Sequence, residues 1–210
     1  GSGGTTSKTV DTNSFTVVVA PASQLVFTTQ PANPTVAGAN LLPVIEIRDV
    51  YGNVVTSGAD ATANITLNLQ SGTGTLSGTL TKAAVAGVVS FTAGESVDVD
   101  IVGAKTLRAS KSDTTGGGGT GVLTQDSNSF NIVHAPASVL VYTTQPADPT
   151  VAGANLLPVI EIRDAHTNVV TSGADATATV TMSLQSGTGS LLGTAAKAAT
   201  GGVVSFTATE

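Results

Sequence analysis

The stretch PTVAGANLLPVIEIRD, residues Pro34–Asp49, recurs letter for letter as Pro149–Asp164, 115 residues further along the chain. The repetition extends well beyond this stretch, since residues 20–95 and 135–210 are identical at 59 of 76 aligned positions. An internal repeat of this length indicates tandem copies of one folding unit. A unit of 115 residues has the usual size of a domain and can bury a hydrophobic core of its own.

Alternation of side chains within this stretch predicts a β-strand. Ile45 and Ile47 face one side, whereas Glu46 and Arg48 face the other, which is the two-residue period of a half-buried strand. We expect the isoleucines in the core and the charged side chains in solvent. Ile65–Leu69, Val89–Ala93 and Val97–Ile101 alternate in the same way. Leu25–Gln30, Lys105–Ala109 and Phe130–Val133 are also predicted to be strands.

With a short segment around Leu76, the pattern gives seven or eight strands in a unit, separated by turns, and no segment has helical periodicity. The predicted fold class is therefore all-β, an antiparallel β-sandwich in each unit. The aromatic residues at inward-facing positions are predicted to belong to the cores, namely Phe27, Phe91, Phe130, Tyr142 and Phe206.

The 115-residue offset also predicts the domain boundaries. Residues 1–19 align with 116–134 and are expected to be the final strand of a preceding unit, which makes this segment a possible donor strand. Residues 20–134 form the first unit, and residues 135–210 form a second unit that lacks its last two strands. The short connectors contain proline, so consecutive units are expected to form a linear rod. The residues predicted at the joint are Asn13, Phe15, Val17, Val19, Pro21 and Pro136.

Two explanations fit the unfinished second unit. In one, Asn13–Val19 of one chain complete the second unit of a neighbouring copy, which gives head-to-tail strand complementation and a filament. In the other, the chain belongs to a longer tandem array whose units are covalently joined. The counterpart of Val97–Ala109 is supplied by neither end of the chain, which counts against strand exchange.

The composition of the chain excludes several classes of partner and of chemistry. Charged residues make up 10% of the chain and the net charge is −6, so the electrostatic attraction that nucleic acid binding requires is absent. The absence of cysteine excludes disulfides, thiolate metal sites and cysteine nucleophiles. No apolar run reaches the roughly 20 residues that span a bilayer, so we predict no membrane insertion within this chain. A cysteine-free, threonine-rich, acidic repeat sequence suits an extracellular or cell-surface location.

Four acidic residues are candidate calcium ligands, because calcium takes six to eight oxygen ligands. They are Asp49, Asp60, Asp98 and Asp100. The favoured interpretation is structural: Asp49 caps its own turn, while Asp98 and Asp100 lie on a solvent-exposed face. We therefore predict no cofactor.

The sequence contains no pattern of a catalytic site. His134 and His166 align with Val19 and Tyr51, so neither histidine belongs to a site present in every unit, and no Ser-His-Asp motif accompanies them. The run Gly116–Gly119 is not followed by the Lys-Ser or Lys-Thr of a phosphate loop and is interpreted as a loop. We predict that the protein is not an enzyme.

The segment VIEIRDVYGNVVTSGAD, Val44–Asp60, with GVVSFTA at Gly87–Ala93 and TLRA at Thr106–Ala109, resembles the bacterial immunoglobulin-like repeats of cell-surface proteins. This group includes the invasin- and intimin-type adhesins. The second unit departs from the pattern at the turn, where His166 and Thr167 replace Tyr51 and Gly52. The resemblance implies immunoglobulin-like sandwiches that serve as spacers or as building blocks of extracellular fibres.

We therefore expect a structural component of an extracellular filament or cell-surface stalk, whose partners are copies of itself or adjacent immunoglobulin-like repeats. The alternative is an adhesin module that binds a host or surface ligand through end loops such as Val50–Asp60. A binding module is expected to vary its loops between copies. Because VVTSGAD is identical at Val54–Asp60 and Val169–Asp175, the sequence favours the spacer.

Overall fold

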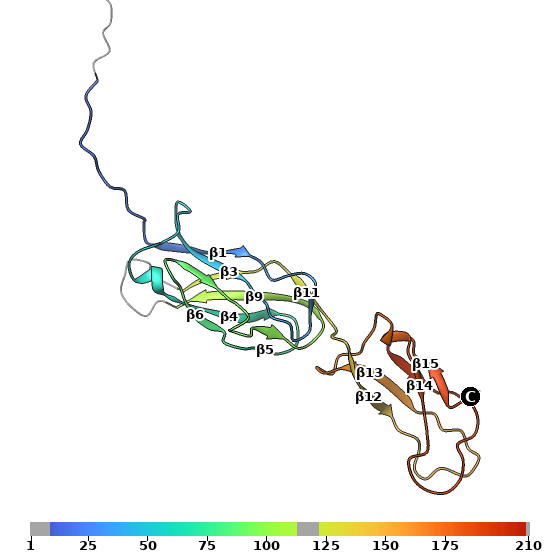
Figure 1. The fold of residues 1–210 in the computed structure, drawn as a ribbon. Coiled ribbons are helices and arrows are strands. Elements are labelled where there is room, and N and C mark those ends of the chain that lie inside the picture. Colours follow the sequence, from blue (N-terminus) through green and yellow to red (C-terminus); the bar gives the residue numbers. More distant parts are fainter. Residues whose placement is uncertain (1–8, 113–121, 209–210) are drawn as a thin grey trace, which may run out of the picture.

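The computed structural model describes residues 9–112 and 122–208. The prediction of an all-β fold is confirmed, since the described residues form sixteen strands and two short 3₁₀ helices. Figure 1 shows two groups of strands that follow each other along the chain. Among the described residues, no helix is both long enough and apolar enough to cross a membrane. The glycine run Gly116–Gly119 lies outside the described residues.

The first unit contains eleven strands, several of them only two residues long. They are β1 Ala22–Thr29, β2 Thr35–Val36, β3 Val44–Asp49, β4 Asn64–Ser71, β5 Leu76–Ser77, β6 Thr81–Ala83, β7 Val88–Ser90, β8 Asp98–Val99, β9 Gly103–Lys111, β10 Leu123–Asp126 and β11 Phe130–Val133, with the 3₁₀ helix η1 at Ala59–Thr62. One sheet has the order β1-β3-β7, and the larger sheet has the order β2-β11-β9-β4-β6, with β10 added to β9. Strands β5 and β8 form a separate pair.

A single apolar core lies between the two larger sheets. The three-stranded sheet contributes Leu25, Ile45 and Ile47, and the larger sheet contributes Leu67 and Leu107, all at most 2% exposed. Glu46 and Arg48 lie on the other face of β3 and form an ion pair at 2.6 Å. The predicted direction of the β3 side chains is therefore confirmed, and the unit has the layered character of a β-sandwich.

The segments Leu41–Asp49 and Val97–Ile101 both alternate in the sequence, but each contains less strand than this alternation predicts. β3 begins only at Val44, and the alternating segment Val97–Ile101 contains only the two-residue strand β8. Leu41 and Val97 nevertheless have exposed fractions of 1% and 0%, and the amide of Leu41 donates to the carbonyl of Val97. Alternation reports which side chains are buried, so it does not distinguish a regular ladder from an irregular extended segment.

The second unit repeats the first arrangement with fewer strands. They are β12 Ala137–Thr144, β13 Val159–Asp164, β14 Thr179–Thr181, β15 Ala196–Ala198 and β16 Val203–Ser205, with the 3₁₀ helix η2 at Asp175–Thr177. The sheet β12-β13-β16 matches β1-β3-β7, and the pair β14-β15 matches β4-β6. The register is also the same, because Leu140 pairs with Ile162 as Leu25 pairs with Ile47.

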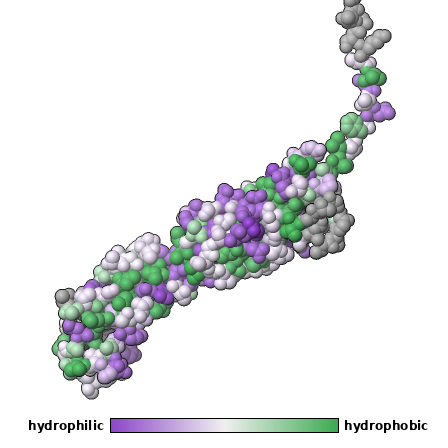
Figure 2. Space-filling model, turned by 180° about the vertical axis from the view of Figure 1, so that it is seen from behind, coloured by the Kyte–Doolittle hydropathy of each residue, from purple (hydrophilic) through white to green (hydrophobic). Residues whose placement is uncertain are grey.

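The core of the second unit is smaller and leaves apolar side chains at the surface. Phe206 is buried as predicted, but the prediction that Tyr142 belongs to the core is wrong, since this residue is 44% exposed. Its neighbour Leu140 is 54% exposed, although its counterpart Leu25 is only 2% exposed. In the first unit β9, β10 and β11 complete the core above β1, and residues 135–208 contain no counterparts of these strands. Figure 2 shows hydrophobic residues interspersed with hydrophilic ones on one face of the second unit.

The core position of Ile47 generates a stability prediction. Ile47→Ala removes a side chain with no exposed surface and should lower the free energy of unfolding of the first unit by about 2–5 kcal/mol. Glu46→Ala is the matched control on the opposite face of β3 and should change it by less than about 1 kcal/mol. Urea titration followed by amide NMR signals of the first unit measures both. Equal losses would contradict the observed direction of the β3 side chains.

Candidate functional site at the joint between the units

A buried aspartate ends the central strand of each unit and organises the turn that follows. Oδ1 of Asp49 accepts hydrogen bonds from the backbone N–H groups of Tyr51 and Asn53, both at 2.9 Å. Oδ2 accepts from Nδ2 of Asn53 at 3.1 Å. The prediction that Asp49 caps its own turn is confirmed. Three hydrogen bonds to one carboxylate hold the conformation of the turn, whatever residues lie at its middle positions.

The corresponding turn in the second unit has the same geometry despite different residues. Oδ1 of Asp164 accepts from the backbone N–H groups of His166 and Asn168, both at 2.9 Å, and Oδ2 accepts from Nδ2 of Asn168 at 3.0 Å. Only the first and last residues of the five-residue turn are shared with the first unit, at Asp164 and Asn168. These are the two residues whose side chains hold the turn.

The same carboxylates also hold the connectors between units. Oδ2 of Asp49 accepts from the backbone N–H of Ala20 at 3.1 Å, and Oδ2 of Asp164 accepts from that of Ala135 at 2.9 Å. Each of these alanines immediately precedes the connector proline, Pro21 or Pro136. Because proline itself fixes the backbone, the chain enters each unit along a direction set by the aspartate.

Both aspartates remain ionised at neutral pH despite their burial. Their side chains have no exposed surface, and burial alone would raise the pKa of each carboxyl. The hydrogen bonds from the turn asparagine and from the backbone N–H groups outweigh burial, so the pKa of Asp49 and the pKa of Asp164 both lie below the ordinary value of 3.8. The ionised form is the one that accepts all of these bonds.

Asn168 links the second unit to the first. Its Oδ1 accepts from the backbone N–H of Val102 at 3.0 Å, and its Nδ2 donates to the carbonyl of Asp100 at 2.8 Å. The Val102 N–H and the Asp100 carbonyl belong to the loop between β8 and β9 at the end of the first unit. Asn168 is only 5% exposed, so these bonds form away from bulk water. One amide side chain thus connects Asp164 with the backbone of the preceding unit.

The two histidines flank this contact. The ring of His166 lies against Gly38, so closely that a Cβ atom on Gly38 would overlap it. Nε2 of His134 lies 2.8 Å from Oγ of Ser172, and Nδ1 lies 3.0 Å from the carbonyl of Ala135. A cavity of about 330 Å³ lies beside this pair, between β11 and the second unit. It is lined by Val102, Ile132, Val133, His134, Val169, Thr171 and Ser172. We call the contacts of Gly38, Asp100, Val102, His134, Asp164, His166, Asn168 and Ser172 the joint.

The structure distributes the predicted joint residues over two places. Pro136 lies in the connector of the joint and is exposed. Asn13, Phe15, Val17, Val19 and Pro21 belong to the segment that precedes the first unit, where the described residues 9–21 form no strand. Phe15 and Val17 are 79% and 83% exposed, whereas Val19 packs against the first core.

Sequence reasoning missed most of the joint, although one signal pointed to it. Three consecutive turn residues differ between the copies, at 50–52 and 165–167, whereas the next residue is asparagine in both. An asparagine that is present in both copies of an otherwise different turn indicates that its side chain has a structural role. His134 and His166 were not predicted at the joint, because neither has a histidine counterpart in the aligned unit.

The four candidate calcium ligands are not brought together. Asp49 is occupied by the amides of its turn, and Oδ1 of Asp60 lies 2.7 Å from Nζ of Lys111, a lysine that is 2% exposed. Oδ1 of Asp100 accepts from the backbone N–H of Thr75 at 2.7 Å, while Asp98 lies in β8. Across residues 9–112 and 122–208, no group of three or more acidic or histidine side chains is placed to hold a metal ion.

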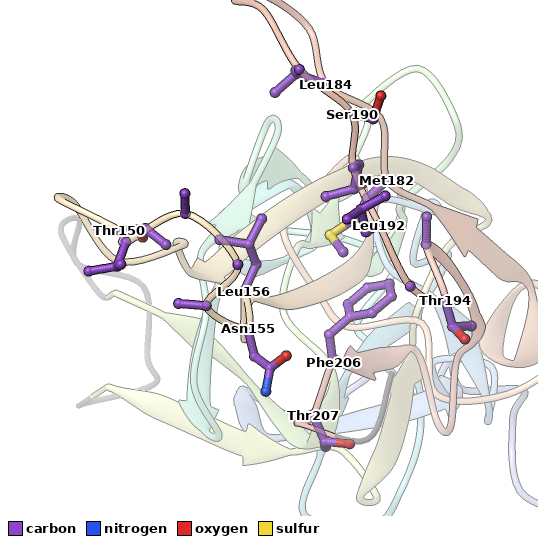
Figure 3. A pocket seen from close by; sticks show the side chains of 18 of the residues that line it. Thr150, Asn155, Leu156, Met182, Leu184, Ser190, Leu192, Thr194, Phe206 and Thr207 are labelled. Atoms are coloured by element: carbon purple, nitrogen blue, oxygen red, sulfur yellow. The ribbon is translucent and has the colours of Figure 1, made fainter.

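The second unit also contains a groove of about 600 Å³, which Figure 3 shows from close by. Residues 150–156 form one wall, Met182, Leu184 and residues 188–195 form the other, and Phe206 lies between them. The counterparts of these walls include β2 and β4, and in the first unit β11 and β9 lie between those strands. The groove therefore has the position of two strands, which argues against a small-molecule site. Thr150–Val151 forms no strand because β2, its counterpart, bonds only to β11.

Comparison with protein-family models, with curated proteins and with solved structures finds no match for this chain.

The contact between Gly38 and His166 generates a prediction with an internal control. Gly38→Ala and Gly153→Ala both place a Cβ at a positive φ, +75° and +81°, and each should cost about 1–2 kcal/mol of stability in its own unit. Only the methyl introduced by Gly38→Ala would meet His166, since a Cβ at Gly153 has nothing within 4 Å. NMR should therefore show shifted signals for the His166 ring and the Val102 amide in Gly38→Ala alone. Unchanged signals in both variants would exclude the contact.

The lowered pKa of Asp164 generates a pH prediction. Its folded pKa lies below 3.8, so its contribution to stability is complete above that pH and is lost as the pH falls through the folded value. Urea unfolding of the second unit between pH 7 and 2 should show this loss, and Asp164→Asn should reduce stability at pH 7 and flatten the acid dependence. Asp148→Asn, which introduces the residue of the first unit at an exposed position, is the control. Identical pH profiles for all three proteins would contradict the role of Asp164.

Proposed function

We propose that this protein is a non-enzymatic structural component of an extracellular filament or cell-surface stalk, built from tandem immunoglobulin-like units in a linear rod. The observation that carries the proposal is that the joint connects the turn at one end of a unit with the loops at the opposite end of the preceding unit. The turn at Asp164–Asn168 contacts loops at the far end of the preceding unit, around Gly38 and Val102. The first unit carries both kinds of end, since Asp49–Asn53 repeats the turn. Head-to-tail contacts of this kind can repeat from one unit to the next, and they form an open line when the rotation between units does not close a ring.

The fixed connector supports a stalk. Ala135 is held by Asp164, Pro136 follows it, and β12 begins at Ala137, so these connector residues have restricted backbone freedom. Asn168 and the pair formed by His134 and Ser172 then limit rotation about the connector. A spacer must transmit position over distance, and a stiff joint does this better than a flexible linker.

The joint supports covalently continuous units more than strand exchange between copies. The groove of the second unit has room for two strands, whereas Asn13–Val19 could supply one. The partners in this proposal are adjacent immunoglobulin-like units. The extracellular or cell-surface location and the bacterial setting rest on composition and on the resemblance to bacterial surface repeats.

An adhesin module remains the second candidate because one end loop of the first unit presents apolar side chains. Val50 and Tyr51 are 68% and 81% exposed. The corresponding turn of the second unit is used in the joint, where His166 contacts Gly38. That use of the same turn favours the structural function.

The proposal predicts that length grows in equal steps. Small-angle X-ray scattering should compare residues 1–210 with a chain in which residues 20–134 are present twice in succession. The maximum dimension should increase by the length of one unit, with the cross-section unchanged. A longer chain with an unchanged maximum dimension would contradict the stalk. Saturable binding on a glycan or protein array, abolished by Tyr51→Ala, would instead support the adhesin.

A further inference from the structure

Both histidines of the chain lie in the joint, although neither has a histidine counterpart in the aligned unit. They come from separate segments, His134 from the connector after β11 and His166 from the turn after β13. The aligned positions of the first unit are Val19 and Tyr51, which carry no imidazole. Imidazole is the side chain whose charge ordinarily changes between about pH 5 and 8. A charge change in this range would therefore be concentrated at the joint.

The hydrogen bonds of His134 define which ring nitrogen carries the proton. Nδ1 lies 3.0 Å from the carbonyl oxygen of Ala135, which can only accept, so Nδ1 is the donor. Nε2 accepts from the backbone N–H of Ser172 at 3.3 Å, and Oγ of Ser172 lies 2.8 Å from the same nitrogen. A nitrogen that accepts from a backbone N–H carries no proton of its own. The joint therefore holds the neutral imidazole with its proton on Nδ1.

A second proton on this ring would have to bind at Nε2. The hydroxyl of Ser172 can turn and accept from the new N–H, because a hydroxyl both donates and accepts. The backbone N–H of Ser172 has no such choice, so it would lose its acceptor and point at another N–H. Since His134 follows β11 and Ser172 belongs to the second unit, the lost hydrogen bond is one that links the two units.

The carboxylates around His134 are engaged elsewhere. Asp164 is bonded to the adjacent residue, Ala135, and its side chain already accepts four hydrogen bonds. Oδ1 of Asp100 accepts from the backbone N–H of Thr75. In the described part of the chain, no carboxylate lies within ion-pair distance of the His134 ring. A protonated His134 would thus gain no ion pair in this arrangement.

Positive charge is already present beside the joint. Lys105 is 1% exposed, and its Nζ donates to the carbonyl of Val102 at 3.1 Å. Val102 in turn lines the cavity beside His134. Protonation of the two histidines would add two positive charges to this contact. The other charged side chains on its elements are Arg163, which is paired with Glu161, and the exposed Asp175.

We infer that the joint is a pH-sensitive switch, which holds the two units in one orientation while His134 is neutral and releases them when Nε2 of His134 takes up a proton. The sign follows from the hydrogen bonds. Because the closed joint accommodates only the neutral ring, closing releases a proton, and acid favours the open form. The charge of His166 adds to the release. The inference rests on the proposed function and adds a condition under which the stalk becomes flexible.

The units themselves should stay folded while the joint opens. Burial would raise the pKa of Asp164, but the hydrogen bonds from Asn168 and from backbone N–H groups outweigh it, so the pKa lies below 3.8. The turn therefore keeps its ionised aspartate at about pH 5. Neither histidine belongs to the core of either unit. A change between about pH 7.5 and 5 thus reports the joint, separately from acid unfolding.

Residual dipolar couplings of residues 1–210 test the switch, because they report whether the two units keep one orientation. At about pH 7.5 the couplings of both units should fit one alignment tensor, and the His134 ring should carry its proton on Nδ1 alone. At about pH 5 the units should require separate tensors, while the chemical shifts within each unit are retained.

His134→Gln separates the switch from a general effect of acid. The glutamine amide stays uncharged, and its oxygen can accept from the N–H of Ser172, so this variant should keep one tensor at both pH values. Separate tensors at both pH values would also assign the response to His134, since the orientation would no longer change with pH. His166→Tyr introduces the residue of the first unit and should still lose the common tensor in acid.

Three results would overturn the inference. They are one tensor at both pH values in the unsubstituted protein, an unchanged pH response in His134→Gln, and loss of the response in His166→Tyr. The first of these leaves the stiff stalk standing and removes only the switch. Separate tensors already at about pH 7.5 would contradict the stiff joint itself, and with it both the switch and the proposed function.

Discussion

The buried carboxylate at the end of β3, repeated at the end of β13, is the constraint on which the architecture depends. Each one accepts hydrogen bonds from the turn that follows and from the connector that precedes the unit. A buried carboxylate is costly unless several donors compensate it, and here four donors do so. Because those donors come from two separate segments, satisfying one side chain also fixes how the chain enters the unit. The hydrogen bonds to this carboxylate therefore set the direction of the connector.

The joint extends this network by one asparagine. Asn168 uses its amide to satisfy Asp164 and also to bond the loop between β8 and β9 of the preceding unit. A contact made largely through backbone atoms of one partner tolerates changes in that partner's side chains.

The two units show how strongly burial depends on strands distant in the sequence. β12 and β13 pair in the same register as β1 and β3, and their sequences are nearly identical. Leu140 and Tyr142 are nevertheless exposed where Leu25 and Phe27 are buried. Local sequence and the hydrogen bonds between strands are therefore sufficient to form the three-stranded sheet in both units. The core above it requires side chains from β9 and β11, which lie far along the chain.

From the sequence alone one could derive the repeat, the all-β fold, the burial of Ile45 and Ile47, and the turn cap formed by Asp49. These features depend on neighbours a few residues apart, and alternation or turn chemistry records them directly. Only the tertiary structure could show that Lys111 pairs with Asp60, that Asn168 contacts Asp100 and Val102, and that His166 lies on Gly38. Each of these contacts joins segments that are distant in the sequence, and two of them are made with backbone atoms. A backbone atom has no residue type to signal its role, so the fold had to place it before the contact could be recognised.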